Sequence, residues 1–189
     1  MSITKLKETT KDTLVSNILS SSQYETENLQ SYIWQFSGPV VKVASLYKDE
    51  NYKTDHEKYM KIAKVVSGVS KLTLGFDDGR SYTSRESKSF PGGIGILSKY
   101  DPRTRSWYKL GKNASGLRLS DVFATKQGAL LLLAVHPVEG GVIASDVRLT
   151  HLQKLLEGIH VAEGTVALLV DQNGMVIGST AESVKVQNK

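Results

Sequence analysis

The chain has 189 residues, 40% of them apolar, a formal net charge of +5 and no cysteine; this suits one folded domain, or one domain with a fragment of a second, and excludes wholesale disorder. The absence of cysteine excludes disulfides, thiol catalysis and cysteine-ligated metal sites. The basic residues are spread along the chain and form no stripe with interleaved aromatic residues, so we expect attraction to small anions and no nucleic-acid partner.

The sequence offers no segment that predicts a membrane span or a signal peptide. No run approaches the ~18 uninterrupted apolar residues that a spanning helix needs. The start of the chain, MSITKLKETTKD, lacks the apolar stretch of a signal peptide. We therefore expect this sequence to be soluble, and any membrane anchors of the native protein to lie outside it.

Two helices are predicted in the first third of the chain. Residues 3–36 keep roughly helical apolar spacing, carried by Leu6, Leu14, Ile18, Leu29, Ile33 and Phe36. The pattern can continue through Gly38-Pro39 to Tyr47, because proline can occupy a kink in a helix. Residues 55–66 predict a second helix, with Tyr59, Ile62, Ala63 and Val66 on one face. The thin apolar stripe of the first helix predicts that it packs beside a domain or a partner helix.

The apolar period changes after Gly68 and predicts a hairpin followed by a loop and a helix. Leu72, Leu74 and Phe76 alternate with polar or small residues, and Asp77-Asp78-Gly79 supplies a turn before Tyr82. Residues 90–97, FPGGIGIL, are a glycine-rich loop that leads to an extended piece. Residues 103–112 predict a helix, with Asp101 as its N-cap and Pro102 at its first position.

Three strands and a second hairpin are predicted in the remainder. The strands cover residues 119–125, 129–136 and 141–147, and a turn at 137–140 joins the last two. Residues 149–159 predict a short amphipathic helix, and Asn173-Gly174 favours a hairpin between residues 165–170 and 175–179. The polar tail begins at Ala181. The predicted fold class is α+β, with a meander-like antiparallel sheet.

The densest group of ligand-binding side chains lies in YDPRTRSWYK, at residues 100–109. Arg105 and Tyr108 are three apart, so on a helix they would share a face. A guanidinium offers paired donors that match a carboxylate, and the rings of Trp107 and Tyr108 can close over a small organic ligand. Composition alone leaves a second reading open, a surface arginine beside core aromatic residues.

Several ordered motifs change that balance. The chain has YDPRTRSWY at 100–108, HPV at 136–138, GGVIASDV at 140–147 and LVDQNG at 169–174. In this order and with these gaps, residues 72–179 resemble the double-Cache sensor domains of bacterial methyl-accepting chemotaxis proteins. The resemblance implies a Cache domain, in which a long N-terminal helix packs on a PAS-like antiparallel sheet and a partial second module follows. It implies no cofactor and no bound metal.

The resemblance also implies a binding site outside the cell for a small carboxylate. Carried over by position, Arg105, Trp107 and Tyr108 grip the ligand carboxylate and Tyr100 lines the same pocket. Asp146 stands where the family places an acid that pairs with a ligand ammonium. Members that bind amino acids usually carry Y-x-D on the strand after the helix, where this chain has Phe123, Ala124 and Thr125. Because one carboxylate is missing, we expect a short organic acid without an amine, with an amino acid as the alternative.

The resulting prediction is the periplasmic sensor domain of a membrane-anchored chemoreceptor, which forms a homodimer through its N-terminal helix and is not an enzyme. Residues 1–50 are the long helix, 51–160 the membrane-distal ligand-binding module, and 161–189 the start of a truncated membrane-proximal module or a hairpin. The alternatives are an amino-acid sensor of a chemoreceptor, histidine kinase or diguanylate cyclase, and a ligand-free interaction domain.

Other chemistry is poorly supported by the sequence. The four histidines, His56, His136, His151 and His160, lack the spacing of a metal motif. No G-x-S-x-G marks a serine hydrolase. The glycine run at 92–95 is not followed by the lysine of a phosphate-binding loop, and residues 171–182 lack the pattern of a calcium loop.

Overall fold

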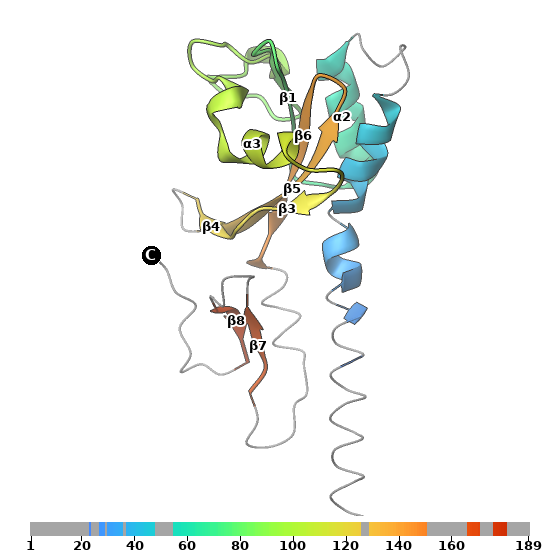
Figure 1. Ribbon diagram of the computed structural model, residues 1–189, viewed down its shortest axis with the longest axis vertical. Coiled ribbons are helices and arrows are strands. Elements are labelled where there is room, and N and C mark those ends of the chain that lie inside the picture. The colour runs from blue at the N-terminus through green and yellow to red at the C-terminus, as the bar shows by residue number, and fades with distance from the viewer. Residues whose placement is uncertain are drawn as a thin grey trace, which may run out of the picture. The chain divides into compact units, whose positions relative to one another are not determined.

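A computed structural model of the chain describes residues 23, 27–28, 30–35, 37–47, 55–125, 129–150, 166–170 and 176–180. The chain divides into two compact units, residues 33–149 in one and residues 1–32 with 150–189 in the other. The first unit contains most of the described residues and all of the predicted site (Figure 1).

The larger unit is built on one antiparallel sheet. Its strands are β1 (Leu72–Phe76), β2 (Ser81–Thr83), β3 (Arg118–Leu119), β4 (Phe123–Ala124), β5 (Leu130–Val138) and β6 (Gly141–Arg148). The order is β2-β1-β6-β5-β3, and β4 also pairs with β5. The α+β fold class is confirmed, but a plain meander is wrong because β6 pairs with β1, with Leu74 opposite Ile143. Both strands are buried on both faces, so their pairing closes the core.

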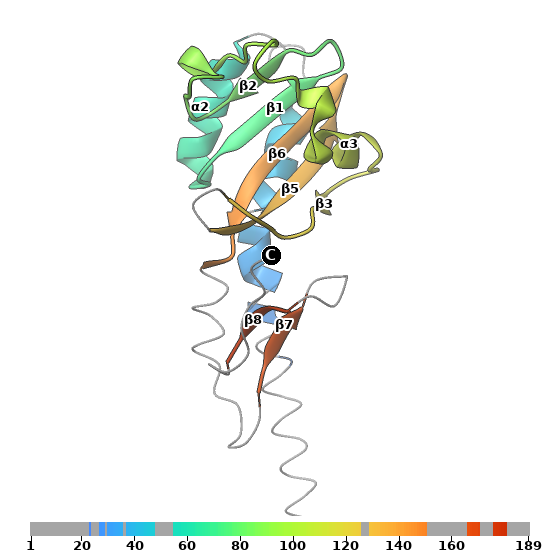
Figure 2. The same cartoon turned by 90° about the vertical axis from the view of Figure 1, so that its left-hand side faces the viewer.

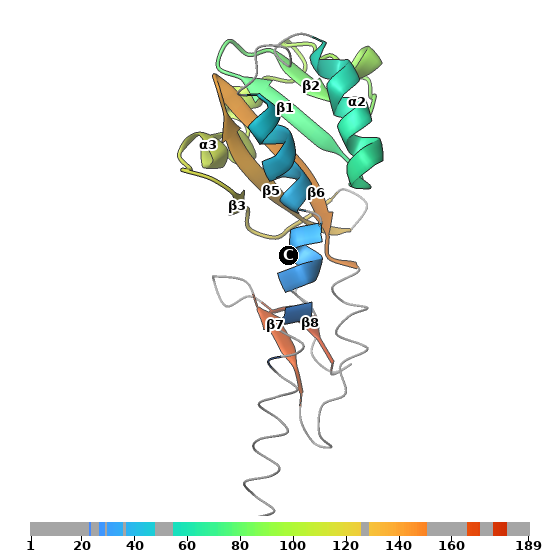
Figure 3. The same ribbon diagram turned by 90° about the vertical axis from the view of Figure 1, so that its right-hand side faces the viewer.

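Two helices cover one face of this sheet (Figure 3). The N-terminal helix runs without interruption through residues 37–46, so the predicted continuation past Gly38-Pro39 is confirmed. The second helix, α2 (His56–Ser67), agrees with the prediction and ends at Gly68, whose N–H bonds the Lys64 carbonyl. The buried side chains of this side are Val40, Val43, Ala44, Tyr47, Met60, Leu72, Leu74, Ile143 and Val147.

The opposite face carries the short helix α3 (Ser106–Lys112) and the 3-10 turn η3 (Pro102–Thr104) (Figure 2). A second 3-10 turn, η2 (Pro91–Gly93), lies beside α2, where a Cβ added at Gly93 would be 3.7 Å from the Glu57 Cβ. Trp107 and Tyr108 of α3 form a buried cluster with Val135, Val142 and Ala144 of the sheet. The side chain of Asp101 caps η3 as predicted, accepting a hydrogen bond from the Arg103 N–H.

The single helix predicted over residues 103–112 is wrong at its beginning. Arg105 has an extended backbone, with φ −84° and ψ 142°, and is the N-cap of α3. The turn made by Asp101 and Pro102 closes when the Arg105 N–H bonds the Pro102 carbonyl at 3.0 Å. The chain then straightens at Arg105 and begins a new helix at Ser106.

The strands around β5 also differ in detail from the prediction. The strands predicted over 129–136 and 141–147 are confirmed as β5, which begins at Leu130, and β6, joined by a tight turn at Glu139-Gly140. The strand predicted over 119–125 is two short pieces, β3 and β4. They are separated at Ser120, whose hydroxyl accepts the Leu133 N–H at 2.8 Å in place of a strand carbonyl.

In the smaller unit, β7 (Leu168–Val170) pairs with β8 (Val176–Ser179), which confirms the predicted hairpin. Residues 151–159 of the helix predicted over 149–159, the tail after residue 180 and the first 22 residues lie outside the described residues. The proposed domain boundaries stay predictions. Among the described segments, no helix combines the length and apolarity that crossing a membrane requires.

Gly75 provides a test of how α3 packs on the sheet. A Cβ added at Gly75 would lie 2.5 Å from the Pro102 Cβ and 3.1 Å from the Trp107 ring. We expect Gly75→Ala to lower the free energy of unfolding by about 1–3 kcal/mol, measured by urea denaturation, because the buried ring has to move. Gly116→Ala is the control, since nothing lies within 4 Å of its Cβ position. Equal stability of the two variants would contradict the close packing.

Candidate functional site

Tyr100 and Trp107 form the centre of the predicted site. Trp107 is buried against the sheet, and its indole N–H donates a 3.0 Å hydrogen bond to the Tyr100 hydroxyl. Tyr100 is also fixed by Phe90, whose ring meets it edge to face with centroids 4.7 Å apart. Burial raises the pKa of the Tyr100 hydroxyl, so it remains a neutral hydrogen-bonding group.

Arg105 is brought to this pair by the extended residue before α3. Its side chain is exposed, and its guanidinium carbon lies 4.4 Å from the centroid of the Tyr100 ring. A guanidinium at this distance is attracted to the face of an aromatic ring, and stacking on a ring leaves the N–H edge of a guanidinium free to form hydrogen bonds. The expectation that Arg105 shares a helical face with Tyr108 is wrong, because Arg105 precedes the first helical turn.

Tyr108 is directed elsewhere. Its ring is in the buried cluster, and its hydroxyl donates a 2.7 Å hydrogen bond to Asp77 in the turn between β1 and β2. Lys112 donates to the other oxygen of the same carboxylate at 2.9 Å. Burial and the neighbouring Asp77 raise the pKa of Tyr108. The hydroxyl therefore braces α3 against the first hairpin.

Asp146 is on β6, and its charge acts on the Tyr100 hydroxyl. It follows Val142 and Ala144 at a spacing of two on β6, so its side chain is on the α3 face of the sheet. Burial raises the pKa of Asp146, partly offset by the cations of Lys71, Arg148 and Arg85. The charge of Asp146 in turn raises the pKa of Tyr100. The two groups therefore interact electrostatically.

Phe123 and Thr125 are on β4 and the loop that follows it. Phe123 pairs with Leu131 of β5 and is 42% exposed. The Thr125 hydroxyl accepts the Ala129 N–H at 3.1 Å, and its own N–H donates to the Ala129 carbonyl at 2.8 Å. Thr125 therefore closes the loop, and its hydroxyl oxygen already accepts one hydrogen bond. Leu133, two residues along β5 from Leu131, is opposite Asp146, so β4 is near that end of β6.

Three cations of this region, Lys71, Arg85 and Arg148, were missed by the sequence analysis. The Lys71 backbone carbonyl accepts the Asp146 N–H at 3.3 Å. Lys71 precedes β1 and Arg85 follows β2, so the two residues flank the first hairpin in the sequence. None of the three belongs to a recognisable motif, and Lys71 and Arg85 meet Asp146 only after β1 pairs with β6. The described residues contain no group of three or more histidine and acidic side chains able to hold a metal.

The arrangement combines two opposite charges with an aromatic wall. Arg105 and Asp146 are both close enough to Tyr100 to affect the pKa of its hydroxyl, in opposite directions. The wall is formed by Tyr100 and the buried Trp107. Such a surface suits a small molecule with an anionic end, and its acid is placed to meet a cationic end.

Comparison with known proteins finds similar sequences and similar folds. No protein-family model matches the chain. It is 29% identical over 116 residues to the methyl-accepting chemotaxis protein McpG of Pseudomonas putida, covering 60% of this chain and 18% of that protein. The chain therefore spans less than a fifth of the length of that relative.

Solved chemoreceptor domains have the same fold. The sensory domain of Campylobacter jejuni Tlp3 with isoleucine bound matches with a TM-score of 0.68 and 17% identity, over 98% of this chain and 80% of that chain. The ligand-binding domain of Pseudomonas aeruginosa PctC in complex with GABA matches with a TM-score of 0.61 and 24% identity, over 83% and 72%. The resemblance to chemoreceptor sensor domains is confirmed.

Asp77 provides a test of the brace beneath the site. Hydrogen bonds from Lys112 and then Tyr108 lower its pKa. A carboxyl whose pKa is lowered on folding stabilises the fold above its unfolded pKa, and this contribution is lost as pH falls. We expect Asp77→Asn to lower stability at neutral pH by less than about 1 kcal/mol, because the pair is exposed. It should also flatten the loss of stability between about pH 5 and about pH 2, followed by urea denaturation.

The hydrogen bond from Lys112 lowers the Asp77 pKa more than the one from Tyr108 does. Lys112→Met removes this hydrogen bond and should therefore flatten the pH dependence of stability in part. An unchanged pH profile in Asp77→Asn would contradict the brace.

Proposed function

We propose that this chain is the extracytoplasmic ligand-binding part of a methyl-accepting chemotaxis protein. The observation that carries the proposal is the position of Arg105, stacked on Tyr100, which is itself held by the buried Trp107. The names of the relatives and the fold of the solved domains support it.

The ligand carboxylate is proposed to bind at Arg105. The guanidinium lies over the Tyr100 ring, so its N–H edge is available for paired hydrogen bonds to a carboxylate. A lysine could not provide this combination, because an ammonium has neither the planar edge nor the stacking face. Trp107 would provide an apolar floor through its position against the sheet.

Asp146 supports a ligand that also carries an ammonium. The sequence favoured an organic acid without an amine, because position 125 lacks a carboxylate. In the structure, burial is the largest cause acting on the pKa of Asp146 and raises it. The three cations near Asp146 lower this pKa only through their charge. A partly buried carboxylate is costly without a close partner, and a ligand ammonium would provide one. Isoleucine and GABA, named with the two solved domains, both combine these groups. We therefore favour a small amino carboxylate.

We propose a signalling role without catalysis. The N-terminal helix covers the sheet face opposite to α3 (Figure 3), so a ligand bound beside α3 would act on this helix through the sheet. A signal requires that the ligand binds one arrangement of the helix more tightly than another. Sensing therefore needs differential binding and no bond-making step.

Thermal shift and calorimetry test the proposed ligand site. Alanine and aspartate are compared with lactate and malate, in which a hydroxyl replaces the amine, and with other amino acids and GABA. Arg105→Ala should abolish the ligand-induced rise in melting temperature, because the carboxylate loses its paired donors. Arg103→Ala is the matched control, since Arg103 is an exposed arginine that pairs with Asp101 in the same motif. Full response in Arg105→Ala would remove the basis of the proposal.

The pH dependence separates the two ligand classes. An ammonium partner requires ionised Asp146, so affinity should fall as pH drops through the raised pKa of that group. Asp146→Asn should weaken amino acids and leave their hydroxy analogues equal or better. An affinity that instead rises on acidification would favour the organic acid, because protonation removes repulsion of its carboxylate.

A homodimer through the N-terminal helix is also proposed. Trp34 and Leu46 of this helix are 55% and 40% exposed, and Ile62 and Val66 of α2 extend the apolar surface. A groove of about 710 Å³ separates the two helices. A second copy would remove this surface from water.

Sedimentation at two protein concentrations tests the dimer. The sedimenting mass of the parent protein should increase with protein concentration. Trp34→Glu should remain monomeric, because dimerisation would bury the new charge in the interface. Ser98→Glu adds the same charge to an exposed loop and should behave as the parent. A monomeric parent at both concentrations would rule the dimer out.

A further inference from the structure

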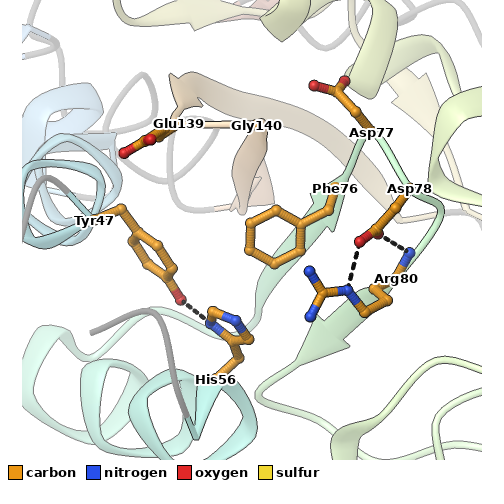
Figure 4. A pocket seen from close by; sticks show the side chains of 8 residues that line it. All are labelled: Tyr47, His56, Phe76, Asp77, Asp78, Arg80, Glu139 and Gly140. Atoms are coloured by element: carbon orange, nitrogen blue, oxygen red, sulfur yellow. Dashed lines mark hydrogen bonds and ion pairs between the residues drawn. The ribbon is translucent and has the colours of Figure 1, made fainter. Parts of the chain in front are cut away.

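A second hollow lies on the helix-covered face of the sheet. Its volume is about 350 Å³, within the range of small-molecule sites. Its lining residues are Tyr47, His56, Phe76, Asp77, Asp78, Arg80, Glu139 and Gly140 (Figure 4). Gly75 faces Trp107, and neighbouring strand residues point to opposite faces, so Phe76 points away from the Trp107 cluster. The sheet therefore separates this hollow from the proposed ligand site.

His56 is the buried polar group of the hollow. Only 6% of His56 is exposed. Its imidazole packs against three aromatic rings, with centroid distances of 5.7 Å to Tyr47, 5.0 Å to Phe76 and 4.7 Å to Tyr82. Its Nδ1 shares a 3.3 Å hydrogen bond with the Tyr47 hydroxyl. When the hydroxyl donates to Nδ1, the neutral imidazole carries its proton on Nε2, which becomes a donor for a further group.

Arg80 brings a guanidinium to the same space. Its Nε donates to Asp78 at 2.6 Å, and the Asp78 carboxylate also accepts the Arg80 backbone N–H at 2.9 Å. The guanidinium carbon lies 5.3 Å from the centroid of the Phe76 ring. Figure 4 shows its outer nitrogens directed toward Phe76 and His56. Since Nε is the atom that bonds Asp78, the outer nitrogens remain for Tyr82 and for the hollow. Asp78 and then Tyr82, each through a hydrogen bond and its charge, raise the pKa of Arg80.

Two of the three acids around the hollow, Asp77 and Asp78, are bound to other side chains. Asp77 is held by Lys112 and Tyr108 on the α3 side, and its carboxylate points away from the aromatic residues in Figure 4. Asp78 is neutralised by Arg80. Glu139 lies across the hollow from Arg80. Besides Glu139, the groups that line the hollow include a guanidinium, an imidazole, a phenol hydroxyl and an aromatic ring, a set rich in hydrogen-bond donors.

We propose that this hollow is a second small-molecule site, which takes a small organic carboxylate with an apolar body. The carboxylate lies between the Arg80 guanidinium and the His56 imidazole, and the body lies against Phe76 and Tyr47. This assignment does not depend on the ligand site at Arg105. Its occupant would contact Tyr47 at the end of the N-terminal helix, His56 in the first turn of α2, and the first hairpin.

Binding at this site is linked to protonation of His56. Burial and then the Arg80 cation lower the His56 pKa, so its imidazole is neutral when the hollow is empty. A bound carboxylate offsets both causes and raises that pKa, so affinity increases as pH falls. The other charged or titratable groups facing His56 or lining the hollow are Tyr47, Asp55, Glu57, Asp77, Asp78, Tyr82 and Glu139.

Calorimetry with sodium benzoate on the full chain tests the proposal, with benzamide and benzylamine as neutral and cationic probes of similar shape. Benzoate should bind, and more tightly at about pH 5.5 than at about pH 8, because acidification favours the protonated imidazole. Arg80→Gln should weaken benzoate by at least about tenfold. Arg103→Gln is the matched control, because Arg103 also bonds an aspartate two residues earlier through Nε and backbone N–H.

The histidine resonances provide an independent readout in nuclear magnetic resonance. Benzoate should raise the pKa of the His56 imidazole, and Arg80→Gln should abolish this effect. Equal binding of benzamide, preferential binding of benzylamine, or unchanged affinity in Arg80→Gln would overturn the proposal. So would no binding at millimolar benzoate, or binding that is lost in Arg105→Ala and kept in Arg80→Gln. The last result would locate benzoate at the other site.

Discussion

Trp107 packs against the sheet at a point where β1 has no side chain, because residue 75 is glycine. The indole can therefore lie close to the backbone while its N–H reaches the Tyr100 hydroxyl. Gly111 of α3 permits a similar approach, since a Cβ there would overlap Val142 of β6. These two close contacts hold α3 on the sheet, and the position of Arg105 follows from them because Arg105 is the N-cap of α3.

The same alternation along β1 divides the functional groups between the two faces. Gly75 directs Trp107 to one side, whereas Phe76 contributes its ring to the cluster of Tyr47, His56 and Tyr82 on the other. The guanidiniums differ accordingly. Arg105 lies over the Tyr100 ring, whereas Arg80 forms an ion pair with Asp78 and lies over the Phe76 ring. Each face thus combines one arginine with aromatic rings.

Local features of the chain were largely predictable from the sequence. The hairpin of β1 and β2, α2, the Asp101 cap and the hairpin of β7 and β8 depend on turn chemistry and apolar period, which neighbouring residues determine. The break at Arg105 was not predictable, because a 3-10 turn and an α-helix share the same residue preferences over so few positions. The pairing of β6 with β1 brings together residues about 70 apart, and no local pattern encodes it.

The candidate site was predicted through ordered motifs, but its electrostatics depend on that distant pairing. Asp146 acquires Lys71 as a neighbour only because β6 lies beside β1, and its burial follows from its place in a central strand. The β1–β6 ladder also joins the two proposed sites. Asp146 is at one end of it, where its N–H bonds the Lys71 carbonyl, and Asp77 bonds the Gly140 carbonyl at the other end. A displacement of β6 would reach both sites, because antiparallel hydrogen bonds keep the strands in register along the ladder.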